Sequence, residues 1–365
     1  MNNQEKIIHI IQHIKNILHT RPKHMELVDF YHNVFEQYKE KVASLDDIIT
    51  RPKILKEGLI ETIEKVEERI YQSLDDYYAG RLSSAIAEMD FLFQDLDLLL
   101  PQKYNQYSMN QDDVWYRGRI KKEGIQIYAY REMFHIPNHM RENVSNQRFS
   151  FNGYPCLYLG KSIWTCWEEL DEAHLDDICF AAVKITKGFR VFDLSIPTAE
   201  SIHDKSTEEL ISMLVTMPLK IACSVKTMNE GANFKSEYII PQLLMIELIE
   251  HYRYDGYIFT STKENATFGW NEKYLLNVVL PVSGEFDKNG LCISLKDKMQ
   301  ITNPICHQYE ILKSTISNMI PISTEEINFF MEHGHEKSED NIDIYPRTTF
   351  GQMEKILTEA EYFTL

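Results

Sequence analysis

The sequence lacks the short motifs that mark several common enzyme classes. It contains no Gly-x-Gly-x-x-Gly stretch, no P-loop and no Gly-x-Ser-x-Gly elbow, which argues against a Rossmann site, a P-loop site and a serine hydrolase. No run of about 18 apolar residues is present, so we expect no membrane-spanning helix and no membrane partner. Polar residues interrupt the N-terminal apolar stretch, which lacks a small-residue cleavage site and does not resemble a signal peptide. We therefore expect a cytoplasmic protein.

Paired cysteines and an excess of basic residues are also missing. The six cysteines include no Cys-x-x-Cys pair, which favours reduced, mostly buried thiols and argues against a structural metal site. Only 38 lysines and arginines face 55 acidic residues, so the net charge is −17. Because such a surface repels a phosphate backbone, we expect no nucleic-acid partner. A protein this acidic that binds an anionic small molecule must gather its arginines locally.

At 365 residues the chain is long enough for two domains. The first hundred residues contain few glycines and prolines, and their apolar residues recur at helical spacing, which predicts four helices in a helical bundle over residues 1–105. From residue 112 short β-rich runs alternate with helical segments, which predicts a mixed α/β domain over residues 112–282. We expect residues 283–365 to form an extension packed on that domain. The predicted fold class is α+β.

The predicted elements of the second half can be given by residue range. Expected strands cover residues 114–116, 125–130, 156–159, 179–185, 189–194, 257–260 and 275–280. Expected helices cover residues 162–170, 207–217, 237–251, 325–332 and 350–360, with a hairpin turn at 284–290 and a solvated loop at 333–343. Ser206 and Glu209 have the spacing of a capping box at the start of the second of these helices.

Two arginines lie at the end of the first expected strand. Arg117 and Arg119 are two residues apart, so a strand would direct both side chains to one face. A pair of guanidinium groups on one face suits a diphosphate. For this pair considered alone, two solvent-facing arginines are the favoured interpretation.

A second group of candidates lies between residues 148 and 169. Arg148 precedes an apolar strand, Tyr158 alternates with leucines on that strand, and Glu168 and Glu169 close a short helix. One glutamate of the pair is expected to face outward as an ordinary solvated carboxylate, and the other could point into a cleft. Taken singly, these residues also fit a surface arginine, a half-buried core tyrosine and solvated carboxylates. Ser261 ends a further strand and has no adjacent base, so we interpret it as a ligand-binding serine rather than a nucleophile.

Six stretches in a common order resemble the RES domain family, which is named for Arg, Glu and Ser. The resemblance covers roughly residues 112–282. The stretches are Glu132-Met-Phe-His-Ile-Pro137, Gln147-Arg-Phe-Ser150, Pro155-Cys-Leu-Tyr-Leu-Gly160, Pro218-Leu-Lys-Ile-Ala-Cys-Ser224, Glu237-Tyr-Ile-Ile-Pro-Gln-Leu-Leu244 and Tyr254-Asp-Gly256. The name-giving residues would be Arg148, Glu169 and Ser261. Glu169 is preferred to Glu168 because it is the eleventh residue after Tyr158, which is the family's spacing.

The resemblance implies an ADP-ribosyltransferase-like fold and an attack on NAD⁺. Characterised members are toxins of toxin–antitoxin modules that deplete NAD⁺ by phosphorolysis or hydrolysis of the nicotinamide–ribose bond. It implies catalytic roles for Glu169, Arg148 and Ser261. It also implies that Arg117, Arg119, Tyr158 and Asn277 bind the dinucleotide. NAD⁺ would be a substrate rather than a cofactor, with inorganic phosphate as an optional co-substrate.

Several functions remain open at this stage. The chain could act as an intracellular NAD⁺-depleting toxin or a phage-defence effector, with an antitoxin or immunity protein as partner and with a homo-oligomeric state left open. It could instead transfer ADP-ribose to a protein, or serve as a non-catalytic nucleotide-binding or interaction module. The sequence does not choose between phosphate, water and a protein as the acceptor.

Overall fold

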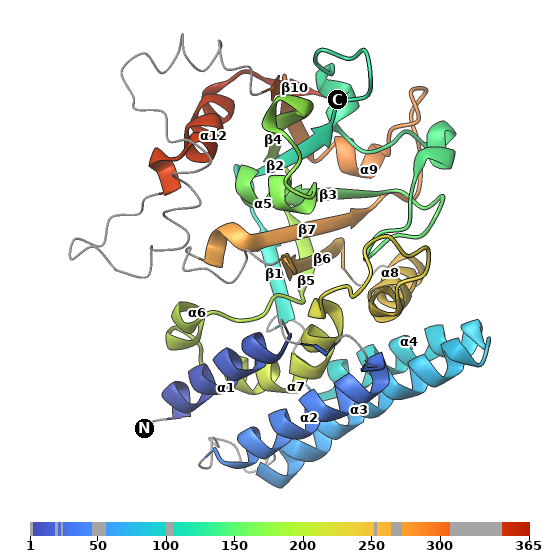
Figure 1. The fold of residues 1–365 in the computed structure, drawn as a ribbon, viewed down its shortest axis with the longest axis vertical. Helices are drawn as coiled ribbons and strands as arrows, with labels where there is room; N and C mark the ends of the chain where they lie inside the picture. Colours follow the sequence, from blue (N-terminus) through green and yellow to red (C-terminus); the bar gives the residue numbers. More distant parts are fainter. Residues whose placement is uncertain are drawn as a thin grey trace. The chain divides into compact units, whose positions relative to one another are not determined.

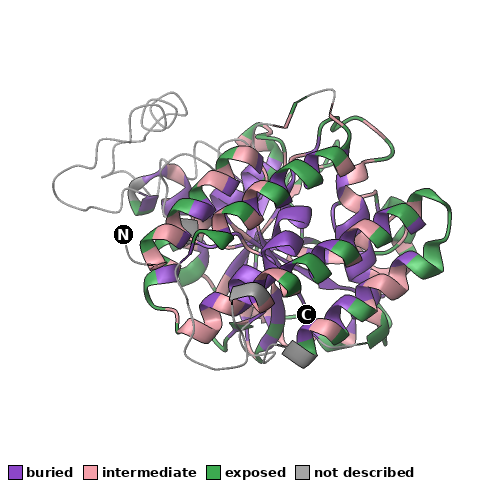
Figure 2. Cartoon of the chain, turned by 90° about the horizontal axis from the view of Figure 1, so that it is seen from below, coloured by how far each residue is buried: buried purple, intermediate pink, exposed green. Residues whose placement is uncertain are grey.

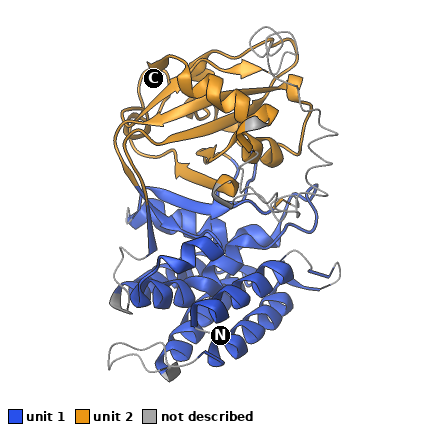
Figure 3. Cartoon of the chain, turned by 90° about the vertical axis from the view of Figure 1, so that its left-hand side faces the viewer, with its two compact units in different colours: residues 1–107, 145–152, 190–262 blue, residues 108–144, 153–189, 263–365 orange. Residues whose placement is uncertain are grey.

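A computed structural model describes residues 3–18, 21–22, 25–45, 56–99, 105–251, 254–263, 272–306 and 345–365. The chain divides into two compact units, which Figure 3 colours separately. The first comprises residues 1–107, 145–152 and 190–262, and the second comprises residues 108–144, 153–189 and 263–365. Helices at the N-terminus followed by a mixture of strands and helices confirm the predicted α+β class. These units do not follow the boundaries at residues 105, 112 and 282, which stay predictions.

Four amphipathic helices open the first unit, in agreement with the apolar spacing. They are α1 (Asn3–Leu18), α2 (Leu27–Ala43), α3 (Lys56–Tyr78) and α4 (Leu82–Leu99) (Figure 1). Buried and exposed residues lie on different sides of these helices (Figure 2). In α1, for example, the buried residues are Ile7, Ile10, Ile11, Ile14 and Leu18. An apolar stripe at this spacing buries itself against neighbouring elements.

Helix α7 (Thr207–Ser224) lies at the centre of the first unit, against α3, α1 and α8 (Ile239–His251). The predicted capping box is confirmed, because Ser206 Oγ accepts a hydrogen bond from the Glu209 N–H and the Ser206 N–H donates to Glu209 Oε2. The hydroxyl groups of Tyr31 and Tyr38 on α2 donate to backbone carbonyls of α7 at 3.0 and 2.7 Å. The unit also contains α6 (Ala199–His203) and a parallel pair of strands, β5 (Phe189–Asp193) and β6 (Gly256–Thr260).

The second unit is built on an antiparallel sheet in the order β7-β3-β2-β4-β8-β10, with β9 also paired to β4. Its strands are β2 (Val114–Ile120), β3 (Cys156–Gly160), β4 (Ile178–Ile185), β7 (Leu276–Pro281), β8 (Met299–Thr302), β9 (Ile305–Cys306) and β10 (Tyr362–Thr364). Its helices are α5 (Ile163–Glu169), α9 (Ile293–Lys296) and α12 (Thr349–Glu359). Strand β1 (Gln106–Met109) falls at the boundary between the units.

One predicted strand is wrong. Residues 125–130 form bends and irregular backbone that lead into a 3-10 helix at Tyr130–Met133 rather than a strand, and Ile125 and Ile127 are 38 % and 54 % exposed. One edge of β2 pairs with β4 along residues 114–120 and the other pairs with β3 at Tyr116, and residues 125–130 join neither ladder. Tyr128 anchors the segment instead, because its hydroxyl contacts the backbone of Ile120 and Lys122. The predicted turn at 284–290 is confirmed by the bridge between Phe286 and Cys292.

Two further predictions, the helix at 325–332 and the loop at 333–343, lie outside the described residues. Within the part of the chain that the structure describes, no helix is both long and apolar enough to cross a membrane.

Candidate active site

Helix α5 follows β3 and carries both candidate glutamates. The connection from β3 to α5 needs a glycine at its start, because a Cβ at Gly160 would lie 2.8 Å from Cys166 Sγ and 3.0 Å from the Ser162 carbonyl oxygen. Ser162 then caps the helix by accepting a hydrogen bond from the Thr165 N–H at 3.0 Å. The Ile163 N–H, a second free donor of the first turn, donates to Glu354 Oε1 at 2.7 Å.

An aromatic cluster fixes the rotation of α5. The rings of Trp164 and Trp167 lie 5.1 and 5.3 Å from the ring of Phe350 on α12, and 5.1 Å from each other. Aromatic pairs at such distances contribute about 0.5–1.5 kcal/mol each beyond their burial. With this face of α5 held against α12, the two glutamates at its end have different surroundings. Glu168 is 1 % exposed, whereas Glu169 is exposed to solvent.

Glu169 is oriented by an amide from the neighbouring sheet. Asn277 Nδ2 donates to Glu169 Oε1 at 2.7 Å, and Asn277 is only 4 % exposed. In the β3–β7 ladder Asn277 lies opposite Gly160. Tyr158, two residues earlier on β3, lies on the same face and is half-buried. The structure therefore brings Glu169 and Asn277 together and places Tyr158 on the strand beside them.

Glu168 has a different chemical state. Burial, and secondly the negative charge of Glu169, raise the pKa of Glu168 to about 8. Among the described residues neither carboxyl oxygen has a hydrogen-bond partner, although the nearby Trp164 side chain partly offsets the rise in pKa. We expect Glu168 to be a neutral carboxylic acid at pH 7. The exposed carboxylate of the pair is Glu169, which is the residue that the family spacing selects.

The turn after α5 adopts an unusual backbone conformation. Asp171 and Glu172 have φ values of 56° and 53°, in the left-handed region that costs a non-glycine residue about 1–2 kcal/mol. Lys263 Nζ binds Asp171 Oδ1 at 2.7 Å, which ties this turn to the segment after Ser261 in the sequence. Strain of this kind often accompanies functional sites.

Arg117 and Arg119 lie on one face of β2, as predicted, but their guanidinium groups have separate contacts. Arg117 Nη1 donates to the Tyr158 carbonyl at 2.9 Å, and burial lowers the pKa of Arg117 to about 10, which leaves it charged at neutral pH. The Nε of Arg117 is buried and has no partner among the described residues. Arg119 lies over the ring of Tyr128 at 4.5 Å and donates to the Glu132 carbonyl. Arg117 is therefore the better candidate for an anionic ligand.

Arg148 and Ser261 belong to the first unit, so they are described separately from the other candidates. Arg148 is 8 % exposed and donates to the carbonyls of Cys223 and Val225 at the end of α7 and to Thr262 Oγ1 at 3.0 Å. Its guanidinium also lies 5.2 Å from the Tyr238 ring centre. These acceptors are neutral. Arg148 thus caps α7 and holds the residue after the buried Ser261.

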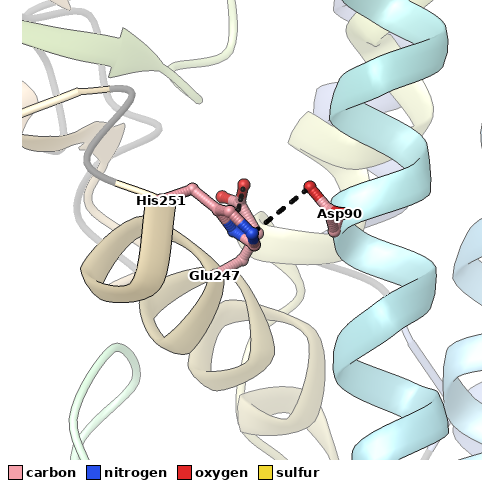
Figure 4. Close-up of side chains that lie close together, drawn as sticks. All are labelled: Asp90, Glu247 and His251. Atoms are coloured by element: carbon pink, nitrogen blue, oxygen red, sulfur yellow. Dashed lines mark ion pairs between the residues drawn. The ribbon is translucent and has the colours of Figure 1, made fainter.

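One group among the described residues could hold a metal ion. Asp90 on α4 and Glu247 and His251 on α8 offer ligand atoms within 4.8 Å of one another (Figure 4). An imidazole and two carboxylates suit Zn²⁺. However, His251 Nδ1 faces Glu247 at 3.4 Å while His251 Nε2 faces Asp90 at 3.8 Å. An imidazolium bridging two carboxylates fits this geometry as well as a metal does, and the expected absence of a metal stays a prediction.

Sequence reasoning missed two residues that support the site. Glu354 caps α5, but it lies 191 positions away from Ile163 and no local pattern connects them. Thr262 holds Arg148, and its place directly after Ser261 at a strand end was a usable signal. The roles of Arg117, Arg119, Arg148, Tyr158, Glu169, Ser261 and Asn277 in a reaction stay predictions.

Comparison with known proteins gives one distant relative. The chain is 28 % identical over 297 residues to a protein of Bacillus subtilis (strain 168) named "Putative toxin YopC". The match covers 77 % of this chain and 66 % of that protein, so it spans slightly less than two thirds of the relative's length. No family model matches the chain. No solved structure matches it either.

Proposed function

We propose that this chain is a toxin that breaks the nicotinamide–ribose bond of NAD⁺, with phosphate or water as the acceptor. The name of its Bacillus relative supports the proposal that the chain is a toxin. The resemblance to the RES family supports the proposal that it cleaves NAD⁺. The observation that carries it is the hydrogen bond between Asn277 and Glu169, which holds an exposed carboxylate in a fixed orientation.

The chemistry requires little more than such a carboxylate. When the bond between the ribose carbon and the nicotinamide nitrogen breaks, the electron pair goes to the nitrogen and neutral nicotinamide leaves. Departure therefore needs no general acid, in contrast to ordinary glycosides. Positive charge develops on the ribose, and a preorganised anion stabilises it. In this proposal Glu169 supplies the anion and Asn277 keeps it in place.

The other candidates would bind the dinucleotide. Arg117 combines a charged guanidinium with a buried Nε that has no partner among the described residues, and so suits a phosphate oxygen. Tyr158 offers a half-buried ring on the face that carries Asn277. The participation of Arg148, Ser261 and Arg119 rests on the resemblance alone. An antitoxin or immunity protein as partner is part of the same proposal.

Incubation of the purified protein with NAD⁺, with and without inorganic phosphate, tests the proposal directly. We expect nicotinamide to appear, together with ADP-ribose 1″-phosphate when phosphate is the acceptor or ADP-ribose when water is. Mass spectrometry distinguishes these products. A mass increase on a protein in the mixture would instead support ADP-ribose transfer. Unchanged NAD⁺ under all conditions would contradict the proposed activity.

Replacement of Asn277 tests its positioning role. We expect Asn277→Ala to lower kcat about tenfold with a smaller change in KM, because the carboxylate remains but loses its fixed orientation. Initial rates of nicotinamide release measure both constants. Asn143→Ala, at an exposed position, is the matched control and should leave both unchanged. Equal rates for Asn277→Ala and the wild type would show that the amide does not orient the reacting group.

A further inference from the structure

Two cysteines face each other on neighbouring strands of the second unit. Cys179 on β4 and Cys306 on β9 are partners in the antiparallel ladder, and their Sγ atoms are 2.6 Å apart. Cys179 is fully buried and Cys306 is 6 % exposed. Both are free thiols.

The backbone around this pair suits a disulfide. Residues directly opposite each other on antiparallel strands have Cα atoms about 4.5–5.5 Å apart. This separation lies within the range of about 4.4–6.8 Å found for disulfides. The two sulfurs can therefore bond without movement of either strand.

The environment also favours the thiolate form of one of the two cysteines. A hydrogen bond from the Cys306 thiol lowers the pKa of Cys179 to about 7, and the positive charges of Lys121 and Arg119 act in the same direction. The same interaction raises the pKa of Cys306. Burial, in contrast, raises the pKa values of Cys156, Cys166 and Cys223 to about 12. Because the thiolate is the reactive form, Cys179 is distinguished from these three cysteines.

We propose that Cys179 and Cys306 form a dithiol site that a small hydroperoxide oxidises to an intramolecular disulfide. The oxidant must be small, because Cys179 is fully buried and Cys306 is only 6 % exposed. In a reducing compartment such a bond would be transient, which is typical of redox-responsive pairs.

The reaction is balanced in two steps. The Cys179 thiolate attacks the terminal oxygen of the hydroperoxide, the O–O bond breaks, and the leaving alkoxide or hydroxide takes up a proton. The resulting sulfenic acid then reacts with the Cys306 thiol, which forms the S–S bond and releases water. Each sulfur loses one electron, and the peroxide is reduced by two electrons.

Treatment of the reduced full-length protein with hydrogen peroxide tests this site. After treatment, the protein is denatured, its free thiols are alkylated, and its intact mass and peptides are measured. We expect the alkylation of four of the six cysteines, because two are joined, and one crosslinked peptide containing Cys179 and Cys306. A reductant should restore the alkylation of all six. Peptide mapping of the wild type needs no variant, so a folding defect cannot obscure the result.

Single-cysteine variants test which two cysteines form the crosslink. Cys179→Ser and Cys306→Ser should each abolish the crosslink, whereas Cys156→Ser, at the half-buried cysteine of β3, should retain it. Alkylation of all six thiols after peroxide treatment would overturn the proposal. A crosslink between other cysteines, or further oxidation at one cysteine without any crosslink, would overturn it as well.

Discussion

Replacement of Glu169 by glutamine is expected to lower the rate of NAD⁺ cleavage about 100- to 1,000-fold. The substitution keeps the length of the side chain and an oxygen that can accept from Asn277, but it removes the negative charge. Loss of one electrostatic contact to a charged transition state costs about this much. The initial rate of nicotinamide release measures the loss, and thermal unfolding of the same sample shows whether the fold is intact.

The adjacent residue supplies the matched control. Glu168→Gln makes the same chemical change one position earlier, at a side chain that is buried and, with a pKa of about 8, already neutral at pH 7. We therefore expect it to keep most of the activity at neutral pH. If Glu168→Gln lost the activity and Glu169→Gln kept it, the assignment of the two carboxyl groups would be reversed. If both variants kept it, neither glutamate would stabilise the transition state.

The assignment of the two glutamates shows what local sequence can and cannot predict. The helical spacing of apolar residues over 162–170 is a local feature, and it predicted α5 within one residue at each end. Which glutamate faces inward depends on the rotation of α5, and the contact of Trp164 and Trp167 with Phe350 sets this rotation. Phe350 lies more than 180 positions later in the chain. The family spacing selected Glu169, but no periodicity in the sequence predicted the contact of the two tryptophans with Phe350.

The arginines illustrate the same limit. Alternation on β2 correctly placed Arg117 and Arg119 on one face. However, Arg117 donates to the Tyr158 carbonyl, whereas Arg119 contacts Tyr128 and Glu132. The segment with Tyr128 was expected to be a strand. This segment instead forms irregular backbone anchored by the Tyr128 hydroxyl on the end of β2, which brings the aromatic ring over Arg119. An error about one strand thus concealed the partner of a candidate site residue.

Glu168→Gln is also expected to change how stability depends on pH. In the folded protein the pKa of Glu168 is about 8, whereas its ordinary value is 4.5. Between these values the folded state holds a proton that the unfolded state has released, so the free energy of unfolding falls as pH rises. Each pH unit in this interval lowers the free energy of unfolding by about 1.4 kcal/mol. The wild type should therefore lose on the order of 4 kcal/mol relative to Glu168→Gln between pH 4.5 and 8, and the loss should level off about one pH unit above the folded pKa.

Urea unfolding at several pH values measures this difference. The pKa values of Glu67 and Glu354 are also raised by burial, to about 7, but both proteins contain these groups, so their effects cancel in the comparison. Glu142→Gln, at an exposed glutamate whose charge is not among the causes of the raised pKa of Glu168, is the control and should follow the wild type at every pH. A constant difference between wild type and Glu168→Gln across this pH range would show that Glu168 is ionised in the folded protein.

The activity variant provides an independent check on the same electrostatics. The negative charge of Glu169 is the second cause of the raised pKa of Glu168, after burial. Glu169→Gln removes this charge, so the pKa of Glu168 should fall and the stability of Glu169→Gln should level off at a lower pH than that of the wild type. Because burial is the larger cause, the pKa should stay above 4.5. A single substitution would then slow catalysis by removing the exposed carboxylate and shift the titration of the buried one, as expected of a pair of neighbouring, electrostatically coupled glutamates.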